Sequence, residues 1–247
     1  MPDQPLSVQL YSVRKAVADD LPAALDRLAG IGFAAVELYG FVDRAEEYAA
    51  ALTAAGLTAP SGHAPVLQYD DPRPAFEAAK RVGVGTLIDP HHPREHWASA
   101  DDVKAVAERM NRIAAAAAEH DLAFGYHNHE HELQADFDGV SGLELLEQHL
   151  DPAVVLEVDT FWVTVGGRSA PELLRRLGDR VRFVHVKDGP ITRDTATQLP
   201  AGQGDVDVPA VLAAAPQAMR VLEFDDYAGD PFDGLAESFR FVSELER

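Results

Sequence analysis

Ionisable side chains recur along this sequence in pairs two residues apart, inside short apolar runs. The pairs are Glu157 with Asp159, His185 with Lys187, Glu223 with Asp225, and His127 with His129. Side chains two residues apart lie on the same face of a β-strand. Burying so many ionisable groups without partners would cost several kcal/mol each, and convergence on a shared cation removes that cost. The spacing therefore predicts a divalent metal site that includes Asp159, His185 and Glu223.

The donor types restrict the metal. Histidine and carboxylate ligands without sulfur are typical of Mn²⁺, Mg²⁺, Co²⁺ or Zn²⁺ in an open site, where water or substrate completes the coordination. The sequence has no cysteine, which excludes thiolate ligands, disulfides and a cysteine nucleophile. Glu37, His63 and His91 also end apolar runs, and for each of them alone a hydrogen-bonded core position is the better interpretation.

The elements that must position these residues alternate along the chain. The predicted strands are residues 8–12, 34–39, 58–63, 86–90, 123–129, 154–161, 181–187 and 221–225. The predicted helices lie around residues 21–29, 44–55, 73–82, 100–120, 142–149, 170–177, 208–214 and 235–245. Such alternation predicts a parallel sheet, and eight units in 247 residues favour a closed barrel. We therefore expect residues 1–247 to form one (β/α)₈ TIM barrel, with the polar pairs at the C-terminal ends of its strands.

The composition restricts partners and location. The formal net charge is −20, from 41 acidic and 21 basic residues, which makes nucleic acid a poor partner. We see no signal sequence and no apolar run near the ~20 residues that a membrane helix needs. Together with the missing cysteines, this predicts a cytoplasmic protein without a membrane partner. Residues 192–207 carry no helix or strand pattern, so we expect a mobile lid there.

Several separated motifs resemble those of a known family. They are Val8-Gln9-Leu10-Tyr11-Ser12-Val13-Arg14, Val36-Glu37-Leu38, Gly62-His63-Ala64, Tyr126-His127-Asn128-His129 with Glu132, Glu157-Val158-Asp159-Thr160-Phe161-Trp162, His185-Val186-Lys187-Asp188, Gly202-Gln203-Gly204-Asp205-Val206-Asp207 and Leu222-Glu223. In this order they cover nearly the whole chain. The sequence resembles the xylose isomerase-like TIM barrel superfamily, and within it the sugar phosphate isomerase/epimerase group, which includes inosose dehydratase-like proteins.

The resemblance implies a metal ion held by a Glu on strand five, an Asp on strand six, a His on strand seven and a Glu on strand eight. The last three correspond to Asp159, His185 and Glu223. The strand-five Glu is missing here, and His127 is the nearest inward-pointing group. His127 either completes the metal site or acts as a base, with water as the fourth ligand.

The resemblance also implies isomerase or epimerase chemistry on a keto-sugar or polyol, through an enediolate. Glu223, His127 or His63 is expected to transfer protons, and Lys187 to stabilise an oxyanion or bind a hydroxyl. Substrate contacts are expected from Glu132, Trp162, His129 and Glu157.

Other functions fit the same residues. A metal-dependent lyase or dehydratase acting on inosose or 3-keto-glycosides gains weight because the strand-five Glu is missing. A non-catalytic sugar-binding or accessory protein would also tolerate that loss. Phosphodiester cleavage, known for an apurinic endonuclease family with this barrel, is disfavoured by the acidic charge. The sequence leaves room for a homo-oligomer.

Overall fold

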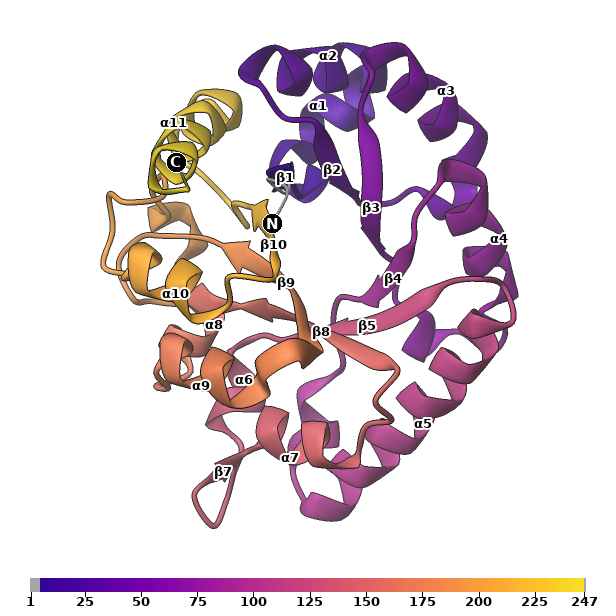
Figure 1. Cartoon of the computed structure of the whole chain (residues 1–247), viewed down its shortest axis with the longest axis vertical. Helices are drawn as coiled ribbons and strands as arrows, with labels where there is room; N and C mark the ends of the chain where they lie inside the picture. The colour runs from indigo at the N-terminus through magenta and orange to yellow at the C-terminus, as the bar shows by residue number, and fades with distance from the viewer. Residues whose placement is uncertain (1–4, 247) are drawn as a thin grey trace.

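The structure is a computed structural model that describes residues 5–246, and in it a ring of strands is surrounded by helices (Figure 1). The eight barrel strands are β1 (Ser7–Val8), β2 (Ala35–Leu38), β3 (Thr58–His63), β4 (Thr86–Asp89), β5 (Ala123–His127), β8 (Val154–Asp159), β9 (Val181–Val186) and β10 (Met219–Leu222). They pair in parallel in the order β1-β10-β9-β8-β5-β4-β3-β2. A parallel bridge between Gln9 and Glu37 joins the two ends of this order. The predicted (β/α)₈ barrel is confirmed.

The helices cover the outside of the ring. They are α1 (Arg14–Asp19), α2 (Leu21–Ile31), α3 (Ala45–Ala55), α4 (Arg73–Val82), α5 (Ala100–Ala118), α6 (Glu130–Gln134), α7 (Gly142–His149), α8 (Thr160–Val165), α9 (Ala170–Leu177), α10 (Val208–Ala214) and α11 (Pro231–Leu245). In α5, for example, Val103, Val106, Ala107 and Met110 are buried, which is the three-and-four spacing of a helix that packs one face on a sheet. Among residues 5–246, no helix has the length and apolar character needed to cross a membrane.

The barrel interior is apolar at one end and polar at the other. Phe183 and Val221 form a small buried cluster with Ile88. They precede His185 and Glu223 by two residues, so each pair shares the inward face of its strand. An apolar floor therefore lies on the N-terminal side of the ionisable groups and closes the barrel beneath them.

Several strands end earlier than predicted, because polar residues at their ends start short helices. Asp159 accepts a hydrogen bond from the Trp162 backbone N–H (2.9 Å) and begins α8, inside the predicted strand 154–161. His129 begins α6, and the His129 backbone N–H donates a hydrogen bond to the Glu132 side chain (3.0 Å). The predicted first strand, 8–12, gives way to a 3₁₀ helix at Leu10–Val13, which the Gln9 side chain caps. These capping side chains therefore determine where each strand ends, and they lie at the mouth of the barrel.

Two further features were not predicted. A two-stranded antiparallel hairpin, β6 (Asp136–Phe137) and β7 (Val140–Ser141), projects from the barrel wall (Figure 1). Asp138 and Gly139 form its turn with φ of +55° and +91°, a known signature of tight hairpins. The segment expected to be a lid contains a 3₁₀ turn at Thr195–Thr197 and is tied to the barrel, since the Leu199 N–H donates to the Asp188 carbonyl (3.0 Å).

Candidate active site

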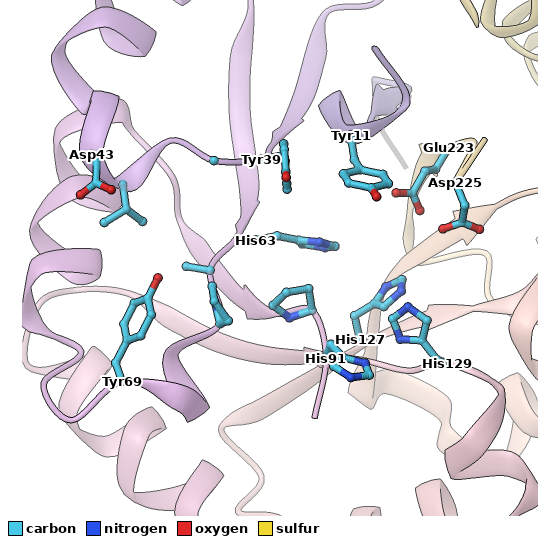
Figure 2. Close-up of a pocket in the computed structure, with 15 residues that line it drawn as sticks. Tyr11, Tyr39, Asp43, His63, Tyr69, His91, His127, His129, Glu223 and Asp225 are labelled. Carbon is cyan, nitrogen blue, oxygen red and sulfur yellow. The ribbon is translucent and has the colours of Figure 1, made fainter. Parts of the chain in front are cut away.

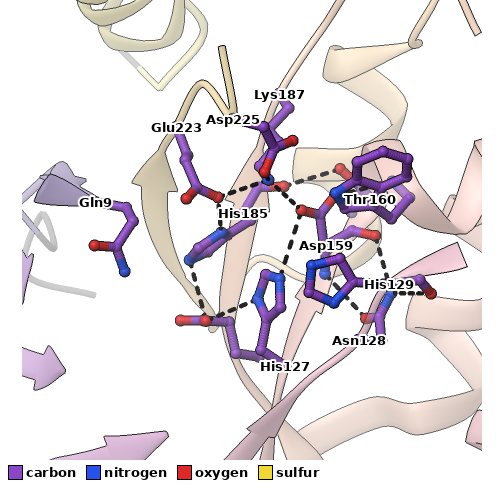
Figure 3. Close-up of polar contacts among 12 residues, drawn as sticks. Gln9, His127, Asn128, His129, Asp159, Thr160, His185, Lys187, Glu223 and Asp225 are labelled. Atoms are coloured by element: carbon purple, nitrogen blue, oxygen red, sulfur yellow. Dashed lines mark hydrogen bonds and ion pairs between the residues drawn. The ribbon is translucent and has the colours of Figure 1, made fainter. Parts of the chain in front are cut away.

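The predicted metal ligands meet at the C-terminal mouth of the barrel. Asp159 ends β8, His185 lies near the end of β9, and Glu223 follows β10. Asp159 and His185 are direct partners in the β8–β9 register. One ligand atom from each of the three side chains lies within 4.8 Å of the others, and all three residues are buried (Figure 3). Parallel strands bring their ends to one edge, so residues far apart in sequence converge here.

Lys187 lies among the carboxylates of this cluster. Its Nζ is 2.8 Å from Asp159 Oδ2, 2.7 Å from Glu223 Oε2 and 2.8 Å from Asp225 Oδ1. Burial raises the pKa of Asp159 to about 6, against the opposing effect of Lys187. Burial also acts to raise the pKa of Glu223, but Lys187 and His185 outweigh it and leave that pKa lowered. The ammonium of Lys187 and the imidazolium of His185 thus balance the three carboxylates only in part.

His185 is held from both sides of its ring. Its Nδ1 lies 2.7 Å from Glu223 Oε2, and its Nε2 lies 2.7 Å from Glu37 Oε1. Glu37 is fully buried and also accepts hydrogen bonds from Gln9 Nε2 (2.7 Å) and Ser61 Oγ (2.5 Å). A carboxylate behind the far nitrogen of a histidine is the usual device that orients a metal-binding imidazole. Glu37 therefore directs Nδ1 toward the candidate metal ligands.

His127 has the same kind of support. Its Nδ1 is 3.0 Å from Glu157 Oε2, and its Nε2 is 3.8 Å from Asp159 Oδ2. Burial, followed by the charge of His185, lowers the pKa of His127 well below its usual value, so the ring is neutral. With Nδ1–H donating to Glu157, the lone pair of Nε2 faces Asp159; this tautomer is assigned from the partners. Glu157 supports His127 as Glu37 supports His185.

His63 joins these two supporting carboxylates. Its Nε2 is 2.6 Å from Glu157 Oε2 and 3.1 Å from Glu37 Oε1. Burial opposes its charge, but Glu37 and Glu157 outweigh burial and raise the pKa of His63 to about 10. Nitrogens of His63, His127 and His185 thus surround one oxygen of Glu157. Glu157, predicted as a substrate contact, lies below the pocket as the centre of a hydrogen-bond network.

A pocket of about 520 Å³ opens above this network. Figure 2 shows Tyr11 and Tyr39 along one side of it and His91, His127 and His129 along the other. His63, Glu223 and Asp225 also line it. The rings of Tyr11 and Tyr39 meet edge to face at 4.9 Å. The pocket therefore combines an ionisable floor with an aromatic rim, as sites for small polar ligands commonly do.

The remaining predicted site residues lie at different depths. His129 lines the pocket; burial, followed by Lys187, lowers its pKa, and within residues 5–246 its Nδ1 has no hydrogen-bond partner. Glu132 is fully buried and accepts hydrogen bonds from Tyr126 OH (2.6 Å) and the His129 N–H, and burial raises its pKa to about 8. Trp162 packs near His129, with ring centroids 6.0 Å apart. Neither Glu132 nor Trp162 is among the residues that line the pocket.

One residue of the site carried no recognisable signal in the sequence. Gln198, 2% exposed, reaches back from the irregular segment after β9. Its Nε2 donates to Asp225 Oδ2 (2.8 Å), and its Oε1 accepts from the Asp225 N–H (2.8 Å). It thereby fixes Asp225 against Lys187. Tyr11 belongs to the motif at residues 8–14, but its place on the pocket rim is seen only in the three-dimensional structure.

Comparisons with known proteins agree with this fold. The chain belongs to the xylose isomerase-like TIM barrel family, whose model matches residues 25–244. No curated protein matches it.

Solved structures resemble the whole chain. One is a sugar phosphate isomerase/epimerase from Parabacteroides distasonis, with 24% identity, a TM-score of 0.78, and coverage of 98% of this chain and 94% of that one. An IolI protein with a bound zinc atom has 13% identity, a TM-score of 0.76 and coverage of 98% of each chain. A probable 3-DHS dehydratase, AsbF, from Bacillus anthracis has 13% identity, a TM-score of 0.76, and coverage of 97% of this chain and 99% of that one. At these identities the likeness shows the fold.

Proposed function

We propose that the protein is a divalent-metal-dependent sugar isomerase or epimerase that acts on a keto-sugar or cyclic polyol through an enediolate. The observation that carries this proposal is the convergence of Asp159, His185 and Glu223 at three adjacent strand ends, with ligand atoms within 4.8 Å of one another and with Glu223 lining a pocket. Family membership and the isomerase/epimerase among the similar structures support it.

The residues present fit a metal ion. Asp159, His185 and Glu223 would hold it, and His127 would add its neutral Nε2 as the fourth ligand. Asp159 Oδ2 supports this fit: it is buried, and within residues 5–246 it lies 2.8 Å from Lys187 Nζ and 3.8 Å from His127 Nε2 without an aligned hydrogen bond. A divalent cation bound here would polarise a carbonyl and acidify the neighbouring C–H. The zinc in the IolI structure is in keeping with this donor set.

The chain's own side chains supply the proton transfers. Glu223 lines the pocket as an ionised carboxylate and takes a proton from the carbon beside the sugar carbonyl. His63 also lines the pocket, carries a proton and donates it to the substrate from another part of the wall. Lys187 keeps Asp159 and Glu223 charged in the buried cluster. Return of the proton to the other face of the carbon would complete an epimerisation.

A lyase is the second candidate, and His63 favours it. A protonated imidazole in the pocket wall can protonate a leaving hydroxyl or glycosidic oxygen, which an elimination requires. The dehydratase among the similar structures is in keeping with this reaction. Product mass separates the two candidates, since loss of water or an aglycone cannot arise from epimerisation.

Proton exchange tests the proposal directly. Protein loaded with Mn²⁺, Mg²⁺, Co²⁺ or Zn²⁺ is incubated in D₂O with a panel of ketohexoses and inososes, and deuterium at the α-carbon is followed by NMR. We expect exchange with at least one substrate, lost in Asp159→Asn and kept in the exposed control Glu119→Gln. No exchange with any metal and substrate would overturn the proposal.

A further inference from the structure

We infer that the pocket takes a neutral, unphosphorylated sugar or cyclic polyol. This inference rests on the proposed function and names its substrate class. TIM barrels frequently bind phosphate groups at the loops after strands seven and eight. In this chain the loop after the seventh barrel strand, β9, is closed around one of its own carboxylates, Asp188.

Asp188 takes the hydrogen bonds that a phosphate would need. It directly follows Lys187 and is 1% exposed. Its Oδ1 accepts from the backbone N–H groups of Gly189 (2.8 Å) and Val206 (3.0 Å). Its Oδ2 accepts from those of Gly202 (2.8 Å) and Gly204 (3.0 Å). Four converging backbone N–H groups form an anion-binding concavity, and here the anion belongs to the protein.

The loop around Asp188 needs glycine at several positions. Gly189 and Gly202 have φ of +142° and +86°, conformations that other residues rarely adopt. A Cβ at Gly204 would collide with Asp188 Oδ1 and with the Gly189 nitrogen. Close packing against the carboxylate thus explains Gly204, whereas Gly202 is explained by its positive φ and by the Phe241 ring, which a Cβ there would meet. With that carboxylate in place, the N–H groups cannot bind a substrate phosphate.

The charges around the pocket point the same way. The residues that line it include Asp43, Glu223 and Asp225, and none of the described lining residues is Lys or Arg. Two neighbouring cations are engaged elsewhere: Lys187 pairs with three carboxylates, and Arg14 Nη1 donates to the carbonyls of Tyr11 and Asp225, each at 3.0 Å. His63 also lines the pocket, but it is paired with Glu37 and Glu157. A phosphate dianion would therefore meet carboxylates and no cation that lacks a partner of its own, whereas proteins normally bind phosphate with Arg, Lys or free N–H groups.

The surfaces that remain suit a neutral sugar. Tyr11 and Tyr39 offer ring faces and edges that can pack against the C–H groups of a sugar ring. His91 and His129 add two further rings to the pocket wall. Burial lowers the pKa of His91, so this ring of the pocket wall is a neutral hydrogen-bonding group that adds no positive charge for an anion.

One pair of arginines provides the strongest opposing feature. Arg94 and Arg193, with side chains 58% and 56% exposed, share the carboxylate of Glu130 at 2.9 Å and 3.3 Å. Neither is among the residues that line the pocket. A substrate phosphate could reach them only from the rim, so the double variant Arg94→Ala/Arg193→Ala is the matched probe for a phosphate site there.

Paired ligands test the inference on the metal-loaded full chain. Calorimetry compares D-fructose with D-fructose 6-phosphate and D-allulose with its 6-phosphate, each at the same ionic strength. We expect each phosphate ester to bind roughly tenfold or more weakly than its parent, from repulsion by the pocket carboxylates. A phosphate ester that binds more tightly than its parent overturns the inference. A phosphate ester whose affinity falls selectively in the double arginine variant overturns it as well.

The carboxylate-filled loop has its own test, with inorganic phosphate as the probe. Thermal unfolding is followed with phosphate and with NaCl at matched ionic strength. We expect a phosphate-specific rise in Tm for Asp188→Ala, which empties the concavity, and none for the parent or for Asp188→Asn, whose amide still fills it. An equal rise in the parent, or a folded Asp188→Ala that does not respond, overturns this argument; if Asp188→Ala does not fold, the paired ligands decide.

These outcomes are separable from those of the proposed function. Absence of proton exchange with every sugar refutes the isomerase or lyase reaction, whatever the affinities. If a phosphate ester exchanges its α-proton faster and binds more tightly than its parent sugar, the reaction is supported and the proposed substrate class is refuted.

Discussion

The two sides of the barrel mouth respond to burial in opposite ways. The carboxylate side consists of Asp159, Lys187, Glu223 and Asp225 at the ends of β8, β9 and β10, and the histidine side consists of His91, His127 and His129 after β4 and β5 (Figures 2 and 3). On the histidine side, burial lowers the pKa of each ring, so the rings are neutral. On the carboxylate side, mutual pairing overcomes burial and keeps Lys187 and Glu223 charged.

The difference shows how one pocket can hold a cation and still offer neutral hydrogen-bonding groups. The carboxylate side provides the negative charge that a divalent ion needs. The histidine side provides nitrogens that need no proton removed before they act as ligands or acceptors. Glu37 and Glu157 lie between the sides and orient one imidazole each, His185 and His127.

Removing charge from the carboxylate side should have the largest effect. Asp159→Asn keeps the size of the side chain but deletes a metal ligand and a partner of Lys187. We expect loss of stoichiometric metal by elemental analysis and a fall in kcat/KM of roughly 10²–10³-fold or more. Removing metal from the parent with a chelator should have the same effect and should be reversed by adding metal back. Full metal content and activity in Asp159→Asn would contradict the assignment.

Changes at His127 test whether the histidine side contributes a ligand. His127→Ala removes the nitrogen that faces Asp159 and should weaken metal binding roughly 100-fold or more. His127→Glu places a carboxylate on the strand where the family resemblance expects one, and we expect it to recover most of that affinity. Competition against a fluorescent chelator measures both variants. Wild-type affinity in His127→Ala would show that water, rather than His127, is the fourth ligand.

A smaller effect is expected from the support between the two sides. Glu157→Gln keeps the shape of the side chain but weakens the hydrogen bond that fixes the His127 tautomer. Metal affinity should fall about 10–100-fold, the usual range for groups behind a metal ligand. The ¹⁵N NMR shifts of the His127 ring should report loss of a single tautomer. Unchanged shifts and affinity would mean that Glu157 has no positioning role, and Glu119→Gln serves as the control.

The barrel and the convergence of Asp159, His185 and Glu223 could be predicted from the sequence because both depend on local patterns. Alternating elements define the fold, and ligands two residues apart on parallel strands must share one edge. How deeply each predicted site residue lies below the pocket surface could not be predicted, since that depends on packing across the barrel. Glu157 lies under the pocket and Glu132 behind it. The short helices α6 and α8 were missed because His129 and Asp159 look like strand residues until their capping bonds are seen. The predictions on nucleic acid, oligomer and cytoplasm stay predictions.

The smallest effect concerns the packing behind the histidine side, at Glu132. Its pKa in the folded protein is raised to about 8 by burial, above the usual value of 4.5, so the folded state keeps a proton that the unfolded chain loses between these two values. This contribution to stability is fully present below pH 4.5 and is lost as the pH rises through about 8.

In urea unfolding of metal-free protein, the free energy of unfolding of the parent should fall toward pH 8 by at most about 1.4 kcal/mol per pH unit from this group. Glu132→Gln lacks this titration, so the difference between its free energy of unfolding and that of the parent should shrink between pH 5.5 and 8.5. Glu119→Gln should follow the parent throughout. Parallel curves for Glu132→Gln and the parent would mean that Glu132 is ionised in the fold, and burial on the histidine side would then not suffice to neutralise a carboxyl group.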